Sequence, residues 1–434
     1  MNLLIANRAE VAVRVARTAA ELGFKTTGIF ASDDAEARHV SAVDEAHDLE
    51  SEGVAAYLDQ SRILAIAKAN QCTHVHPGWG FLSENAEFAA RCEAEGIVFI
   101  GPTPSQLSAF ADKVKARALA HKCEVSVAQG SGPLANESDF NNFLATLPQG
   151  TVVILKATAG GGGRGMTVVD DVSRASDSFK RCQREALAAF GDGTLYAEQW
   201  IQRARHIEVQ ALGDGTGAVT TLGTRDCSVQ RRHQKLIEIA PAPHLAPDLS
   251  RALCDAAKNM AEDVSLRGVA TFEFLVDETD NYYFIETNPR LQVEHTCTEE
   301  VLGIDLVEMQ LAIANGTKLS ELNLNDKPNG YAIQVRINAE RLNAQGQVSA
   351  ETGQLKRFEL SQGPGIRVDS GAYVGYSVTG RYDSLLAKLI VHTPGTDFAR
   401  ALRKTQRALN ECVIDGCGTS LGLATRILQR DEIA

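Results

Sequence analysis

The sequence predicts a mixed α/β and α+β protein, and three features of the chain indicate this fold class. Residues 2 to 112 alternate short apolar strands with amphipathic helices, which is typical of an α/β unit with a parallel sheet. A glycine-rich loop joins two strands between residues 151 and 169. From residue 201 onward strands dominate, including one clear hairpin, and long amphipathic helices accompany them.

Length and composition limit the class of protein. A chain of 434 residues is long enough for about three units of ~150 residues. Its 44% hydrophobic and 23% charged residues are typical of a globular protein. Acidic side chains outnumber basic ones, 55 to 43, so the formal net charge is −12. Because nucleic acid requires a basic face, this balance argues against nucleic acid as a partner.

The sequence also carries information on the cellular compartment. The first residues, "MNLLIANRAE", contain no signal-peptide pattern, and no stretch approaches the ~18 apolar residues of a membrane span. The nine cysteines are scattered, and the closest pair, Cys412 and Cys417, does not form a C-x-x-C motif. We therefore expect reduced cysteines, no membrane partner, and a location in the cytoplasm or an organelle matrix.

In the N-terminal unit, "NLLIA" is a predicted strand, "EVAVRVARTAAELG" a predicted helix and "KTTGIF" the next strand. "THVHPGW" and "IVFIGP" repeat the strand-and-turn pattern. No G-x-G-x-x-G follows the first strand, so a dinucleotide is not indicated. The segment "HPGWGFLSEN" brings two tight turns together with His76 and Glu84, although a packed loop explains it equally well in isolation.

The loop in "LKATAGGGGRGM" contains four consecutive glycines, Gly160 to Gly163. Such a run costs backbone entropy, which indicates a need for close approach or motion. Glycine loops let backbone N–H groups close over phosphates, and Lys156 places a positive charge beside this loop. It is not a Walker A loop, because no Gly-Lys-Ser/Thr ends it and a strand follows it. A flexible surface hairpin is the alternative.

The predicted hairpin joins "TFEFLV" to "YYFIE" through the turn-forming "DETDN". A turn centred between residues 279 and 280 pairs Glu273 with Glu286 and Phe274 with Ile285. Two carboxylates directly opposite one another repel unless a cation lies between them. Together with Asn288 they form a hard oxygen donor set that suits Mg²⁺ or Mn²⁺ on substrate phosphates. A solvated strand edge is the alternative.

Beyond this strand the chain keeps alternating, in "ETNPRLQVEH". If it stays extended, Glu286, Asn288, Arg290, Gln292 and Glu294 lie on one face. We therefore expect this face to carry charged and polar groups over its whole length.

Three further segments carry polar side chains near each other in sequence. "RRHQK" holds Arg231, Arg232, His233 and Lys235, a positive run that could stabilise transferring phosphates or could be a solvated face. "RHIEVQ" places His206, Glu208 and Gln210 on one strand face, where a lone histidine is more often structural than a ligand. "RINAE" does the same for Arg336 and Asn338.

In this order, nine segments resemble the biotin carboxylase component of biotin-dependent carboxylases, a branch of the ATP-grasp superfamily. The segments read "IANRAEVAVRV", "HPGWGFLSEN", "DKVKARALA", "KATAGGGGRGM", "RHIEVQ", "RDCSVQRRHQK", "IETNPRLQVEH", "RINAE" and "RYDSLLAKLIV", and the likeness runs from residue 2 to about residue 428. The resemblance implies an ATP-grasp fold with a Rossmann-like N-terminal domain (1–112), a linker and mobile glycine-rich lid (113–200), a catalytic core (201–330) and a C-terminal mixed-sheet domain (331–434).

The resemblance also implies roles for individual residues. Glu294 matches the base that deprotonates bicarbonate, Arg336 the cation beside the biotin enolate, and Lys235 a contact to the reacting phosphate and bicarbonate. Metal-binding positions match Glu273, Glu286 and Asn288, and the bicarbonate cradle matches Arg290, Gln292 and Val293. Nucleotide-contacting positions match Lys113, Lys156, Gly161, Gly162, Gly163, Met166, Glu198, His206, Gln230 and His233.

The implied reaction has two stages, both dependent on ATP, Mg²⁺ (or Mn²⁺) and biotin. Bicarbonate attacks the γ-phosphate of ATP to give carboxyphosphate and ADP, and carboxyphosphate then releases the CO₂ that biotin captures. The sequence departs from the family pattern at Ala9 and Ala159, where glycine is usual, and at Trp79, where tyrosine is usual.

The resemblance implies partners as well. The four methionines, Met1, Met166, Met260 and Met309, offer no Met-Lys-Met setting for attached biotin. Biotin must therefore arrive on a separate carrier domain or protein, and a carboxyltransferase must use the product. A homodimer is possible, and the chain is expected to be a domain of a larger carboxylase. The alternatives are another ATP-grasp carboxylate ligase and a catalytically silent ATP-binding scaffold module.

Overall fold

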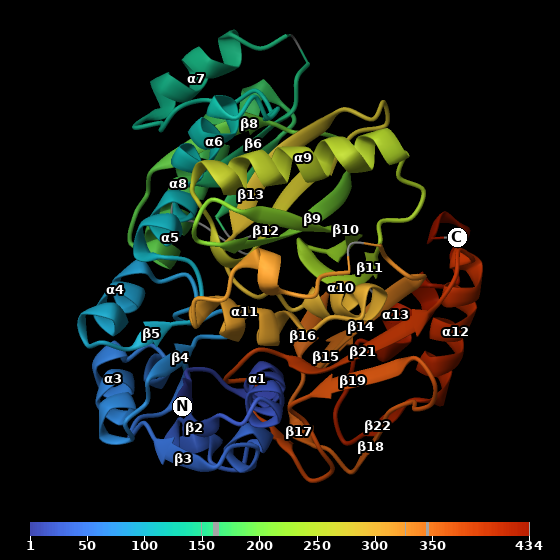
Figure 1. Cartoon of the computed structure of the whole chain (residues 1–434). Helices are drawn as coiled ribbons and strands as arrows, with labels where there is room; N and C mark the ends of the chain where they lie inside the picture. The colour runs from blue at the N-terminus through green and yellow to red at the C-terminus, as the bar shows by residue number, and fades with distance from the viewer. Residues whose placement is uncertain (149, 159–164, 326, 344–346, 434) are drawn as a thin grey trace.

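The computed structural model describes residues 1–148, 150–158, 165–325, 327–343 and 347–433. Its N-terminal part (blue) and C-terminal part (red) lie side by side, and the segment around α7 and α8 (teal and green) lies at the opposite end (Figure 1). The strands of residues 201–288 occupy the space between them (Figure 1). This arrangement confirms the expected fold class, with a parallel N-terminal sheet and antiparallel sheets after it.

The N-terminal sheet has five parallel strands in the order β3-β2-β1-β4-β5. These are β1 (Asn2–Ile5), β2 (Lys25–Phe30), β3 (Glu45–Asp48), β4 (His74–His76) and β5 (Val98–Phe99). The connecting helices are α1 (Ala9–Glu21), α2 (Gly53–Ala56), α3 (Gln60–Ala69) and α4 (Ala86–Ala94), with 3-10 turns η1 (Ser32–Asp34) and η2 (Arg38–Ser41). Leu3, Leu4 and Ile5 are fully buried, because helices cover both faces of a parallel sheet.

Two helices, α5 (Pro104–Ala111) and α6 (Lys113–Lys122), lead to a small separate unit. Its antiparallel sheet runs β7-β6-β8, with β6 (Val153–Ala157), β7 (Met166–Val169) and β8 (Leu195–Gln199). Helices α7 (Glu137–Ala145) and α8 (Ala175–Phe190) and the turn η3 (Val172–Arg174) complete it. The predicted strands on both sides of the glycine loop are thus confirmed, whereas Gly160 to Gly163 lie outside the described residues.

The largest sheet has eight antiparallel strands in the order β13-β12-β9-β10-β11-β14-β21-β19. Their bounds are β9 (Arg205–Asp214), β10 (Val219–Arg231), β11 (Gln234–Ala240), β12 (Arg267–Val276), β13 (Tyr282–Asn288), β14 (Tyr331–Asn338), β19 (Ile366–Ser370) and β21 (Leu385–Thr393). One continuous sheet therefore joins strands from the central and the C-terminal parts of the chain.

Helices and short strand pairs cover this sheet. α10 (His295–Leu302) packs on β14, β10, β11 and β21, and α11 (Leu306–Ala314) packs on β12 and on α1. α9 (Pro247–Asp263) covers β9 and β10, and α12 (Phe398–Glu411) covers β14 and β21. The remaining elements are β15 (Glu340–Leu342), β16 (Val348–Ala350), β17 (Gly353–Gln354), β18 (Arg357–Glu359), β20 (Ser377–Val378), β22 (Val413–Asp415), α13 (Leu421–Ile427), η4 (Leu319–Glu321) and η5 (Asp431–Ile433).

The hairpin of β12 and β13 confirms one predicted pair and corrects the other. Glu273 lies opposite Glu286 as predicted, but Phe274 pairs with Phe284 rather than with Ile285. A register shift between Glu273 and Phe274 leaves Ile285 as the extra residue of a bulge. A regular alternation in the sequence does not reveal where such an extra residue is inserted.

The prediction of an extended chain through Glu294 is wrong, because β13 ends at Asn288. Pro289 follows directly and has no N–H to continue the ladder. A loop leads from there to Glu294, which is the N-cap residue of α10.

Among the described residues, no helix combines the length and the apolar character that a membrane crossing requires. All nine cysteines are free thiols, as expected, and six of them are buried.

Candidate active site

A cavity of about 590 Å³ lies between β6 and β7 of the small unit, the central sheet and the loop after β13. It is the place where the predicted site residues meet. Among the described residues its walls include Lys113, Lys156, Met166, His206, Gln230, His233, Lys235, Glu273, Glu286, Asn288, Arg290, Gln292, Val293, Glu294 and Arg336. Glu286, Asn288, Arg290, Gln292 and Glu294 were predicted to lie on one face of a straight strand. They line one cavity instead because the chain turns after Asn288.

Lys235, on β11, lies at the centre of the charged part of the cavity. Its Nζ is 2.9 Å from Glu273 Oε1 and 2.9 Å from Glu294 Oε1, and it also contacts Glu208. Burial alone would lower the pKa of Lys235, but the three carboxylates raise it well above its usual value. The positively charged Lys235 thus links Glu273 on β12 to Glu294 at the end of the loop after β13.

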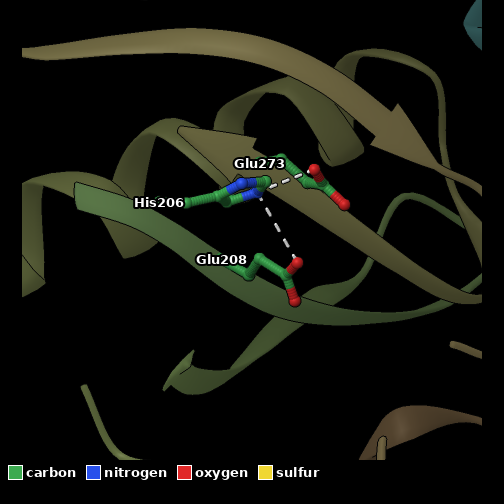
Figure 2. Close-up of side chains that lie close together, drawn as sticks. All are labelled: His206, Glu208 and Glu273. Atoms are coloured by element: carbon green, nitrogen blue, oxygen red, sulfur yellow. Dashed lines mark ion pairs between the residues drawn. The ribbon is translucent and has the colours of Figure 1, made fainter. Parts of the chain in front are cut away.

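His206 lies beside this lysine, on β9. Its Nε2 is 2.8 Å from Glu273 Oε2 and 3.7 Å from Glu208 Oε1, and Figure 2 shows the ring directed between these two carboxylates. Burial alone would lower the pKa of His206, but Glu273 raises it above 6.5. Glu208 is fully buried, and the same burial raises the pKa of its carboxyl. His206 and Glu208 share one strand face, as the sequence predicted.

The two opposed carboxylates, Glu273 and Glu286, lie on the cavity wall where the sequence predicts a metal site. Glu286 has one cationic neighbour, Lys113, at 3.4 Å, and Glu273 accepts a hydrogen bond from the Asn288 side chain at 2.7 Å. Glu286 remains about a third exposed toward the cavity. Two carboxylates and an amide on one cavity wall are hard oxygen donors, so this donor set fits Mg²⁺ or Mn²⁺.

Glu294 is held as a carboxylate by cations on two sides. Arg336 donates to its Oε2 at 3.1 Å, while Lys235 contacts its Oε1. Burial alone would raise the pKa of Glu294, but Lys235, Arg336 and Arg225 lower it far below 4.5. The side chain of Glu294 makes no capping bond to its own helix and points to these cations instead.

Arg336 is itself oriented by a buried acid. Its Nε donates to Glu238 Oε1 at 2.5 Å, and the neighbouring Gln334 donates to the other oxygen of Glu238 at 2.9 Å. The guanidinium is mostly buried and lines the cavity. Glu238 thereby leaves one edge of Arg336 free to face Glu294 and the cavity.

The loop after β13 is fixed by two arginines. Arg290 is paired with Glu84 from the N-terminal unit, and it also donates to Asn288 Oδ1 at 3.0 Å. The fully buried Arg225 donates to Gln292 Oε1 at 2.7 Å and to Glu208. Gln292 in turn donates to Glu273 Oε1 at 3.0 Å. The loop after β13 and the carboxylates of Glu208 and Glu273 therefore form one hydrogen-bonded network.

The other end of the cavity combines cations with apolar walls. Lys156, on β6, pairs with Glu198 at 2.5 Å, and Gln230 Nε2 is 2.8 Å from His206 Nδ1. Burial lowers the pKa of His233. The apolar wall residues at this end are Ile154, Met166, Trp200, Ile201, Leu275 and Ile285. Lysines beside an apolar slot can bind a flat aromatic ring together with its phosphates.

Glu198 differs from the other described candidates because it does not line the cavity. It lies behind Lys156, where Arg117 donates to it at 2.8 Å. Gly161, Gly162 and Gly163 lie outside the described residues.

Sequence reasoning missed Arg225 and Glu238, and it did not connect Glu84 with Arg290. The signal available for Glu238 was a charged residue within the apolar run "LIEIA"; Arg225 lies among polar residues of β10 and had no such signal.

Comparison with known proteins identifies the family. A model described as the biotin carboxylase N-terminal domain matches residues 1–107, and one described as the biotin carboxylase C-terminal domain matches residues 334–434. Between them, the ATP-binding domain of the carbamoyl-phosphate synthase L chain matches residues 112–322. The biotin carboxylase domain of 2-oxoglutarate carboxylase from Hydrogenobacter thermophilus has a TM-score of 0.95 and 38% identity, covering 99% of this chain and 94% of that one.

The chain belongs to the biotin carboxylase family. The Hydrogenobacter structure is a dimer in complex with MgADP, ADP and bicarbonate. A biotin carboxylase from Campylobacter jejuni, in a β,γ-ATP complex, has a TM-score of 0.95 and 37% identity, with 100% of this chain and 96% of that one covered. Both similarities extend over the whole fold.

Longer relatives contain this biotin carboxylase as one part. Pyruvate carboxylase from Aspergillus niger is 44% identical over 436 aligned residues, which are 98% of this chain and 36% of that protein. Human mitochondrial pyruvate carboxylase is 42% identical, over 99% of this chain and 37% of that protein. The chain thus spans little more than a third of the length of these relatives.

Proposed function

We propose that this biotin carboxylase uses MgATP and bicarbonate to carboxylate biotin that a separate carrier presents. One observation carries the proposal. The carboxylate of Glu294 lies between Lys235 and Arg336, in the same cavity as the opposed acids Glu273 and Glu286. The cavity therefore offers a base, a cation for developing charge, and oxygen donors for a metal.

In the first stage, ATP binds with its phosphates toward the charged half of the cavity and its adenine between the apolar walls. Lys113, Lys156 and His233 contact the nucleotide, with Met166 and Gln230 nearby and Glu198 holding Lys156 in place. Glu273, Glu286 and Asn288 would hold the magnesium ion. When bound, this ion neutralises phosphate charge and polarises the γ-phosphate. Gly161, Gly162 and Gly163, which lie outside the described residues, are further nucleotide contacts in this proposal.

Bicarbonate binds in the cradle of Arg290, Gln292 and Val293, and Glu294 removes its proton. A carboxylate held by two cations is a weak base. In the proposed cycle Lys235 turns from Glu294 to the reacting phosphate, which raises the pKa of Glu294 and strengthens it as a base. The deprotonated oxygen then attacks the γ-phosphorus, giving carboxyphosphate and ADP. Proximity of cradle and phosphate makes this an effectively unimolecular step.

In the second stage carboxyphosphate breaks into CO₂ and phosphate, and the phosphate takes the proton from N1′ of biotin. The biotin enolate that results carries negative charge, and Arg336 lies where it can offset that charge. The N1′ nitrogen then attacks CO₂ to give carboxybiotin. Glu238 keeps the guanidinium in place during both steps.

The wider assembly follows from the length of the relatives. We propose a biotin carrier domain or protein and a carboxyltransferase as partners, and a homodimer, which the Hydrogenobacter dimer supports.

The nine free thiols support a reducing compartment, the cytoplasm or an organelle matrix, and the human relative is named as mitochondrial. The domain division proposed from the sequence, 1–112, 113–200, 201–330 and 331–434, is supported by the matched segments 1–107, 112–322 and 334–434.

The variant Glu294→Gln tests the proposal. We expect bicarbonate-dependent ADP release with free biotin to fall roughly 10²- to 10⁴-fold, because the base is removed. Binding of MgATP, measured by calorimetry, should stay close to that of the unchanged protein. Glu359→Gln, which alters an exposed acid paired with Arg357, is the control and should retain full activity.

Three results would contradict the proposal. Full ADP release from Glu294→Gln would remove its central residue. ADP release by the unchanged protein that needs an amino acid instead of bicarbonate would indicate another ATP-grasp ligase. Tight MgATP binding without any turnover on a biotinylated carrier would indicate a silent module.

A further inference from the structure

Two sequence segments, "IANRAEVAVRV" and "RYDSLLAKLIV", have no part in the mechanism above, yet the structure brings a charged residue of each together. Glu10 lies in the first turn of α1, and Lys388 lies in the middle of β21. Lys388 Nζ is 3.0 Å from Glu10 Oε2, and both side chains are fully buried, at 0% and 1% exposure. A buried ion pair of this kind costs desolvation energy that apolar side chains of equal size would avoid.

The lysine makes one contact that connects it to the active site. Lys388 Nζ donates to the backbone carbonyl of Val293 at 3.1 Å. Because the peptide unit is planar, fixing this oxygen fixes the plane that joins Val293 to Glu294. The orientation of Glu294 at the start of α10 therefore depends on where Lys388 holds that carbonyl.

The position of Lys388 is itself set by its neighbours in the sheet. On one side it is the direct cross-strand partner of Arg336, and on the other side that of Asp369. Asp369 Oδ2 is 3.7 Å from Lys388 Nζ, and Arg367 holds the same oxygen at 2.9 Å. Since directly paired residues point to the same face, the Arg336 guanidinium and the Lys388 ammonium form one row.

Glu10 connects this arrangement to a further residue that lines the cavity, Trp79. Its second oxygen, Oε1, accepts a hydrogen bond from Trp79 Nε1 at 3.1 Å. Trp79 lines the cavity and stands where the family usually has tyrosine, near the expected biotin position. The pair of Glu10 and Lys388 thus connects the Trp79 wall to the Val293 carbonyl through a bridge of two side chains.

We propose that Lys388, anchored by Glu10 and Asp369, is a positioning residue that holds the bicarbonate cradle and the base Glu294 in their reactive orientation. The inference rests on the proposed function of this cavity. It explains why a lysine occupies the buried position 388 of β21, where a methionine would pack without the cost of desolvating a charge. The lysine touches no reacting atom, so it acts through the peptide plane between Val293 and Glu294.

The test uses the double variant Lys388→Met/Glu10→Gln, in which both charges of the pair are removed and Asp369 keeps Arg367 as its partner. We expect kcat of bicarbonate-dependent ADP formation to fall roughly 10- to 100-fold, as for a misplaced reacting group. KM for bicarbonate should rise, while the Kd for MgATP changes by less than about twofold, since the nucleotide end is not altered.

A matched control is a lysine of α12 that contacts the same strand. Lys404 also donates to a backbone carbonyl of β21, that of His392, at 2.7 Å, but it lies away from the cavity. Lys404→Met should leave KM for bicarbonate, kcat and the Kd for MgATP unchanged. A merely structural role of Lys388 would reduce the folded fraction and the binding of both substrates together, which circular dichroism and calorimetry would detect.

Glu10→Gln alone keeps the test decisive if the double variant does not fold. Lys388 then still reaches the Val293 carbonyl but has lost one anchor, so we expect a few-fold rise in KM for bicarbonate with unchanged MgATP affinity. The inference is overturned if KM for bicarbonate and kcat match those of the unchanged protein in whichever variant folds. If the unchanged protein itself shows no bicarbonate-dependent ADP release, the proposed function fails instead.

Discussion

At the scale of single residues, His76 shows how a buried neutral side chain shapes the cavity wall. It ends β4, and its Nδ1 accepts a hydrogen bond from the N–H of Gly78 at 3.0 Å. Gly78 has a left-handed φ of +64°, and a Cβ there would lie 2.8 Å from the Asn7 side chain. Glycine and a neutral histidine are therefore both needed for the turn that carries Trp79 into the cavity.

The protonation of His76 leads to a prediction on stability. Burial lowers its pKa from 6.5 to about 4, with Arg14 also favouring the neutral ring, while contacts with Gln310 and Asp305 oppose the shift. The unfolded chain therefore binds more protons than the folded one between pH 6.5 and 4, and stability is lost as pH falls through this window. We expect His76 to contribute a loss of about 3 kcal/mol, measured by urea unfolding at several pH values.

His76→Asn is the matched variant, since its side-chain oxygen can accept the Gly78 hydrogen bond without titrating. Between pH 6.5 and 4, the free energy of unfolding of this variant should fall by about 3 kcal/mol less than that of the unchanged protein. An unchanged slope would show that His76 is already charged in the folded protein or that other groups dominate the window.

At the scale of elements, the start of α1 depends on a close backbone approach. Gly371 follows β19, and a Cβ built on it would lie 2.9 Å from the backbone N of Glu10 and 3.0 Å from the Cα of Ala9. Ala9 stands where the family usually has glycine, and it adopts a left-handed φ of 55°. This tight contact places the C-terminal sheet directly against the helix that carries Glu10.

We expect Gly371→Ala to lower the free energy of unfolding by about 1 to 3 kcal/mol, because neither backbone can yield without a shift. Chemical denaturation measures this change. Gly422→Ala, in α13 with open space around it, is the control and should be neutral or slightly stabilising. Equal stability of the two variants would contradict the importance of the contact.

The elements also show what the sequence could predict. The alternation in "ETNPRLQVEH" correctly gathered Glu286, Asn288 and Glu294 in one site, because both ends of the segment carry groups that face the same cavity. The geometry was wrong beyond Asn288, since Pro289 ends the ladder and a helix begins at His295. Period alone does not show where a strand stops or where a bulge inserts a residue.

Partners from distant strands were not predictable from the sequence. Arg336 and Glu238 meet because β11 pairs with β14, an adjacency that the order of strands along the chain does not give. The parallel N-terminal sheet was predictable, because its alternation of strands and helices is local and periodic. The pairing of the C-terminal strands with the central sheet is a property of the folded chain.

At the scale of the whole molecule, one buried acid joins three parts of the chain. Glu299 lies in α10, and its Oε1 is 2.8 Å from Arg14 of α1, while its Oε2 is 2.8 Å from Arg367 of β19. Asp305 also contacts Arg14, at 2.7 Å. Through this group the N-terminal unit, the helix α10 that follows the loop after β13, and the C-terminal sheet are held in one arrangement.

We therefore expect Glu299→Gln to destabilise the whole chain rather than one part of it. Removing one partner of a buried ion pair costs about 3 to 5 kcal/mol, and the lower value applies because Arg14 and Arg367 keep Asp305 and Asp369. Calorimetry should show the unfolding transition moved to lower temperature. Glu300→Gln is the control, because Glu300 contacts Arg367 from a partly exposed position, at 3.3 Å, and should change stability by less than about 1 kcal/mol. If both variants unfold at the same temperature, the charge on Glu299 does not hold the three parts together, and other contacts, such as those of α1 with α11 and with β19, do so instead.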